Sequence, residues 1–187
     1  MIRSYYSALL RKTALAVCLL TVSVFALPAL DLSAGGGLTL NSVFVTSRFD
    51  SFSDRTSDTG FGIRAFADAT YFEISAGLAL FENRSYLSGS ALVKFPFRIF
   101  SWHIFPLAGA EYRYDLDVSG ASLFVLKGGL GADIPLTDRL FIRPEVLGGY
   151  VFLSEHEEER IDAYEPYGGA EITKKSIDIS IYAGYRL

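Results

Sequence analysis

The feature that most limits how this chain can fold is a two-residue hydrophobic period that recurs in segments of about ten residues. The last segment, SIDISIYAGYRL, shows it clearly: isoleucines and other apolar residues fill one set of alternate positions, and polar or small residues fill the other. Successive side chains of a β-strand point to opposite faces, so this period predicts a strand with one apolar and one polar face.

Turn-forming residues separate the alternating segments. We predict eight strands, at residues 36–47, 61–67, 71–81, 89–97, 104–116, 123–134, 140–152 and 176–187. No apolar run after the N-terminal segment is long enough for a membrane helix. An all-β fold of eight antiparallel strands follows from this pattern.

The predicted connections between these strands alternate in length. Those at 68–70, 98–102 and 135–139 are short, whereas those at 50–60 and 153–175 are long. Outer-membrane barrels have short periplasmic turns and longer extracellular loops. With an even number of strands, the first strand begins and the last strand ends at the same rim, so both termini of the barrel are expected on the short-turn side.

Two prolines interrupt the predicted strands. Proline donates no ladder hydrogen bond, and a closed barrel has no free edge to accommodate it. We expect Pro106 to stand at the opening of its strand and Pro144 to mark a bulge.

The N-terminal segment has the features of a secretory signal peptide. Arg3, Arg11 and Lys12 precede the apolar stretch TALAVCLLTVSVFALPA, which ends in small residues. We therefore predict a cleaved signal peptide at residues 1–29 and a barrel at residues 30–187. An uncleaved membrane anchor is the alternative.

Composition excludes several classes of function. Removing the leader takes away three basic residues and no acidic one, which changes the net charge from −4 to −7. No basic stripe remains to bind nucleic acid. Cys18 is the only cysteine and lies in the leader, so disulfides, cysteine catalysis and thiolate metal sites are not expected in the mature chain.

The polar face distinguishes a membrane barrel from a soluble one. A soluble barrel points its apolar face inward, whereas a membrane barrel points that face into lipid. Many glycines lie on the polar face, and its charged members are nearly balanced in sign. Buried charges must pair, so we expect one lumen charge network made of Arg64, Glu73, Lys94, Glu111, Arg113, Lys127, Asp133, Arg143, Glu145, Asp178 and Arg186.

Aromatic residues gather at both ends of the apolar face, as in a wall that faces lipid. On the short-turn side they are Phe72, Phe95, Phe97 and Trp102, and on the other side Tyr112, Tyr114, Tyr150 and Phe152. An ordinary core rich in aromatic residues is the alternative. The sequence thus predicts an all-β protein of the bacterial outer membrane: an eight-stranded antiparallel up-and-down transmembrane β-barrel preceded by a cleaved signal peptide.

These features resemble the small eight-stranded outer-membrane barrels, the group of the OmpA transmembrane domain, OmpX and OmpW. The resemblance covers the mature chain and includes the final IYAGYRL, with Tyr185 in alternation. It implies that the barrel-assembly machinery reads the last strand, although this chain ends in Leu187 where the family has an aromatic residue. The segments LVKFPF, FPLAGAEYRY and ADIPLTDRLFIRPEVLGGY also resemble spirochaete-type barrels.

The residues favour no enzymatic role. His103 and His156 lie near opposite rims, without a nucleophile or acid placed beside them by strand alternation, and no cofactor or metal site is expected. A structural or surface-interaction role is favoured, with the loops as candidates for binding an extracellular ligand. The alternative is a narrow channel, or an OmpW-like conduit for small solutes.

Overall fold

The computed structural model describes residues 31–49, 52–118, 122–153 and 170–187. They form one antiparallel sheet, and among them no helix is long and apolar enough to span a membrane. Residues 1–30, which contain the predicted signal peptide, lie outside this described part. The strands are β1 (Leu32–Phe49), β2 (Phe52–Ala69), β3 (Phe72–Leu80), β4 (Ser85–Lys94), β5 (Phe97–Ile99), β6 (Trp102–Asp115), β7 (Ser122–Pro135), β8 (Leu140–Val151) and β9 (Ala170–Arg186).

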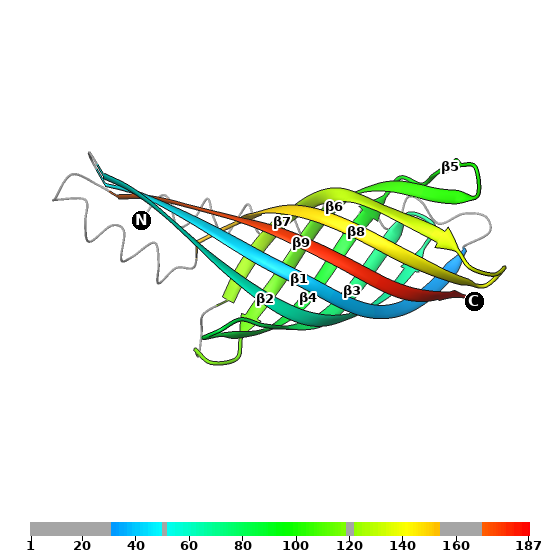
Figure 1. The fold of residues 1–187 in the computed structure, drawn as a ribbon, viewed down its shortest axis with the longest axis horizontal. Coiled ribbons are helices and arrows are strands. Elements are labelled where there is room, and N and C mark those ends of the chain that lie inside the picture. The colour runs from blue at the N-terminus through cyan, green and yellow to red at the C-terminus, as the bar shows by residue number, and fades with distance from the viewer. Residues whose placement is uncertain (1–30, 50–51, 119–121, 154–169) are drawn as a thin grey trace, which may run out of the picture. The chain divides into compact units, whose positions relative to one another are not determined.

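The sheet closes on itself as an eight-stranded barrel (Figure 1). Its strands follow the order β4-β3-β2-β1-β9-β8-β7-β6, and pairing of β4 with β6 joins the two ends. The three-residue β5 continues β4 along β6, with Ile99 opposite Trp102, and therefore does not count as a ninth strand of the barrel. The predicted fold class and strand number are confirmed.

The register of the pairs sets the width of the barrel. The path through paired residues runs around the barrel by way of Gly35, Phe66, Ser75, Ser90, Glu111, Val125, Val151, Lys174 and Val45. It returns to β1 ten residues beyond its start, which is the shear of the barrel. Strand number and shear together fix the radius, and eight strands leave an interior just wide enough for side chains.

The last strand shows which face meets the core. Ile177, Ile179 and Ile181 are 42%, 49% and 55% exposed on the outer surface, whereas Asp178 and Ser180 are buried inside. The apolar face therefore points outward and the polar face lines the lumen.

The outer wall is apolar along its middle and aromatic near both rims. The exposed aromatic residues include Phe95, Phe97, Trp102, Tyr112, Tyr114, Tyr150 and Phe152, and Phe72 is partly exposed. A contiguous apolar surface of this kind is not stable in water and is the normal surface of a barrel in lipid.

Two strands extend into the segments that the sequence predicts as long loops. Residues 50–60 were expected as a loop, but β2 begins at Phe52, and this part of β2 pairs only with β1. Residues 170–175 were also expected as loop and belong to β9. The prediction was wrong here because both faces of these segments are polar, so no hydrophobic period marks them. In Figure 1, β1, β2 and β9 extend together beyond the other strands.

The prolines behave differently from the prediction. Pairing of β7 with β8 stops at Gly131–Glu145 and resumes at Ile134–Ile142 in the same register, so the ladder is interrupted beside Pro144 without a bulge. Pro106 lies four residues inside β6, opposite the break between β4 and β5. Each proline thus stands where a neighbouring ladder is interrupted, because it lacks the N–H group that would continue it.

We expect Ile179→Arg to lower the free energy of unfolding by about 2–4 kcal/mol, because it places a charge in the middle of the lipid-facing wall. Urea unfolding of the protein in lipid vesicles measures this loss, with Ile179→Val as the control that keeps the surface apolar. Equal stability of the arginine variant and the wild type would contradict the assignment of this face to lipid.

Candidate functional site

The lumen is the candidate site, because the inward face of every long strand contributes polar side chains to it. Of the eleven charged residues predicted to line it, nine are buried, while Asp133 and Arg186 are partly exposed. Their ion pairs form two groups at different depths. We define the rim with the 69–72, 99–102 and 135–140 connections as the turn side, and the opposite rim as the loop side.

The loop-side cluster consists of Arg64, Glu111, Arg113, Lys127 and Asp178. Glu111 is its centre: its carboxylate accepts hydrogen bonds from Arg64 (2.6 Å), Arg113 (2.5 Å) and Lys127 (2.6 Å). Asp178 accepts from Arg113 at 3.1 Å and also pairs with Lys127. Three cations share two carboxylates, and the cluster carries an excess of one positive charge.

The turn-side cluster consists of Asp68, Glu73, Lys94, Asp133 and Arg143. The Arg143 guanidinium contacts all three carboxylates, at 2.6 Å for Asp68, 2.8 Å for Glu73 and 2.6 Å for Asp133. Lys94 adds a second cation at 2.5 Å from Asp68. This cluster carries an excess of one negative charge, opposite to that of the loop-side cluster.

Asp68 belongs to this site but was not predicted there. The sequence placed it in the short connection at 68–70, whereas β2 continues to Ala69 and keeps Asp68 on the same inward face as Arg64. It accepts a hydrogen bond from Ser33 in addition to its ion pairs. An even number of residues separates Asp68 from Arg64, so alternation along the strand could have assigned Asp68 to the lumen.

Glu145 and Arg186 are the two predicted members without an ion pair among the described residues. Glu145 is buried, and its charged neighbours include Arg64 and Lys127 on one side and Glu73 and Arg143 on the other. Its Oε2 atom has no hydrogen-bond partner in the described part of the chain. Arg186 instead lies 3.4 Å from Nδ1 of His103 and 5.6 Å from the ring centre of Phe141.

Aromatic rings surround the turn-side cluster. The Arg143 guanidinium lies 4.3 Å from the ring centre of Phe66 and 5.1 Å from those of Phe105 and Phe141. Rings at this distance attract a cation through their electron-rich faces. Sequence reasoning missed these residues because it assigned only polar side chains to the lumen.

Glycines on the same face accommodate these rings. A Cβ atom at Gly184 would stand 2.2 Å from the Phe141 ring, and one at Gly131 would stand 2.5 Å from the Phe105 ring. Any larger residue at these two positions would force the rings to move. These two lumen glycines therefore make room for aromatic side chains.

Apolar residues fill the lumen beside the charges. Leu92, Phe105, Leu107 and Leu147 form one buried cluster. Phe66, Phe141 and Tyr182 form a second one, with the Phe66 and Tyr182 rings edge to face at 5.3 Å. The turn-side half of the lumen is therefore packed with rings and leucines as well as ion pairs.

Comparisons with known proteins give similarity at the level of structure. No family model matches the sequence, and no curated protein matches it. The outer membrane protein OprG from Pseudomonas aeruginosa is 15% identical with a TM-score of 0.49, over 85% of this chain and 96% of that one. Neisserial surface protein A is 12% identical with a TM-score of 0.46, over 83% and 99%. Ail of Yersinia pestis is 14% identical with a TM-score of 0.39, over 84% and 99%.

The class of the protein rests on its own geometry. The sheet is closed, the outer wall is apolar with aromatic rims, and the charged side chains lie inside. A backbone that crosses a bilayer must satisfy its hydrogen bonds internally, and a closed barrel does so. The chain is a small eight-stranded β-barrel of the outer membrane.

We expect Glu111→Gln to destabilise the barrel by about 3–5 kcal/mol, because it removes the charge shared by three buried cations. Glu145→Gln is the matched control: it is equally buried and loses no ion pair, so its cost should be much smaller. Chemical unfolding of both variants in vesicles gives the two values. Equal losses would show that burial, and not the ion pairs of Glu111, determines stability.

Proposed function

We propose that this protein is a sealed outer-membrane barrel with a structural or surface-interaction role, and not an open pore. The observation that supports the proposal most is the content of the turn-side lumen, where Arg143 holds three carboxylates among the rings of Phe66, Phe105 and Phe141. Moving an ion through this layer would require it to displace paired charges and packed rings together.

A narrow channel or conduit for small solutes is the second candidate. Buried polar atoms of Asn41, Ser176 and Glu145 have no hydrogen-bond partner among the described residues. Such atoms normally bind water when protein offers no partner. They favour a hydrated loop-side half of the lumen, so the barrier to conduction is expected in the turn-side half.

We expect the wild type to show no stepwise conductance in planar bilayers, because the turn-side layer blocks the lumen. Phe105→Ala should introduce a small conductance, since it removes one of the rings around Arg143. Phe95→Ala is the matched control, because Phe95 lies on the lipid-facing wall. Stepwise conductance of the wild type would favour the channel instead.

The proposed surface role requires that the loop side faces the outside of the cell. We propose that the extension formed by residues 41–49 of β1, 52–60 of β2 and 170–176 of β9 stands above the membrane with the adjoining loops. The mainly polar residues 52–60 of β2 and 170–176 of β9 support this placement, because polar strand faces are not suited to lipid. The predicted loop residue His156 lies outside the described residues.

Cysteine labelling tests this orientation, since Cys18 is the only cysteine and lies in the predicted leader. A membrane-impermeant thiol reagent should label Ser53→Cys on intact cells and leave Asp138→Cys unlabelled, because these exposed residues lie at opposite rims. Labelling of position 138 alone would reverse the orientation.

One further role is proposed for the last strand. The alternation and Tyr185 of β9 support recognition of the last strand by the barrel-assembly machinery, as the family resemblance implies.

A further inference from the structure

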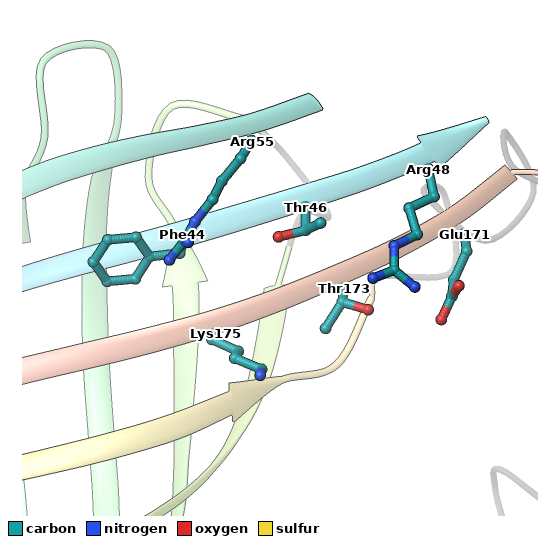
Figure 2. Close-up of a pocket in the computed structure, with 7 residues that line it drawn as sticks. All are labelled: Phe44, Thr46, Arg48, Arg55, Glu171, Thr173 and Lys175. Carbon is teal, nitrogen blue, oxygen red and sulfur yellow. The ribbon is translucent and has the colours of Figure 1, made fainter. Parts of the chain in front are cut away.

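The outward face of the three-stranded extension carries a group of cations. Phe44, Thr46 and Arg48 on β1, Arg55 on β2, and Glu171, Thr173 and Lys175 on β9 line a shallow cavity of 260 Å³. Figure 2 shows these side chains on the strands of the extension. The face carries three cations and one carboxylate, although the whole chain has a net charge of −4.

The register leaves two of these cations without a carboxylate opposite them. Arg48 stands opposite Glu171, the one carboxylate of this group. Arg55 stands opposite Thr46, and its other side is a free edge because β2 pairs with β3 only from Phe61 onward. Lys175 stands between Phe44 of β1 and Tyr150 of β8.

Stacking fixes one of the two cations in position. The Arg55 guanidinium lies 5.6 Å from the ring centre of Phe44, which stands opposite Lys175. A planar guanidinium held against a ring keeps its N–H donors free for a second ligand and suits the geometry of phosphate oxygens. The two cations are thus arranged around one aromatic ring.

The position of the group indicates what its ligand is. On β9 the outward residues Ile181, Ile179 and Ile177 belong to the lipid-facing wall, and the next outward residue toward the loop side is Lys175. A lipid whose acyl chains lie against these isoleucines would bring its headgroup to the level of Lys175 and the residues above it. Basic residues at this level attract anionic headgroups.

We propose that Arg55 and Lys175 form a binding site for a phosphate-bearing lipid headgroup of the leaflet on the loop side. The apolar wall holds the acyl chains, Lys175 meets the phosphate at the edge of the wall, and Arg55 provides a bidentate donor further from the membrane centre. The site lies on the outer surface and is independent of the state of the lumen.

Native mass spectrometry of the purified full-length protein tests the site. The protein is mixed with lipid A, a phosphorylated glycolipid, and its dephosphorylated form in equal amounts, and the ratio of the two bound lipids is measured. The wild type should favour the phosphorylated lipid. Arg55→Gln and Lys175→Gln should each reduce that preference about fivefold.

Three controls separate the explanations. Arg98→Gln removes a cation near the turn side and should leave the preference unchanged, and Lys175→Arg, which retains the charge, should keep the preference of the wild type. Circular dichroism confirms that each variant is folded.

An unchanged preference in the folded Arg55→Gln, Lys175→Gln double variant would overturn the proposal, as would absence of a preference in the wild type. Displacement of the lipid by equimolar inorganic phosphate would assign the site to a free anion and overturn it also.

Discussion

The absence of water from the hydrocarbon layer is the constraint on which the rest of this structure depends. A strand in lipid cannot leave its N–H and C=O groups unpaired, so the ladder closes through β4 and β6. Closure with eight strands and a shear of ten residues fixes a narrow interior. The side chains that point inward must then fill that interior and satisfy one another, because little space remains for bulk solvent.

Alternation predicted the facing of side chains well where one face meets lipid. Ile179 and Asp178 lie on the surfaces that the sequence assigns to them, because a one-residue slip would bury the wrong set. The same signal failed at residues 52–60, where both faces are polar and the strand continues without a hydrophobic period. The sequence analysis assigned no face to Phe66 and Phe105, and both lie buried in the lumen although they are apolar.

Ion-pair partners could not be predicted from alternation, because they depend on the stagger between strands. Glu111 meets Lys127 from the adjacent β7, but it also meets Arg64 from β2, which lies across the lumen. The reach of an arginine across a barrel depends on what the intervening positions hold. Gly77 is one such position, since a Cβ atom there would stand 3.2 Å from the Cα atom of Arg64.

The division of the charges into two clusters has a physical consequence for the lumen as a whole. Each cluster alone carries one unpaired unit of charge, and the two units have opposite signs, so they attract each other along the barrel axis. Glu145 lies within reach of both clusters and makes no ion pair of its own among the described residues. Burial and Glu73 oppose the ionised form of this carboxyl group, whereas cations of both clusters favour it. The turn-side half of the lumen therefore combines ion pairs with packed rings, whereas the loop-side half is more polar.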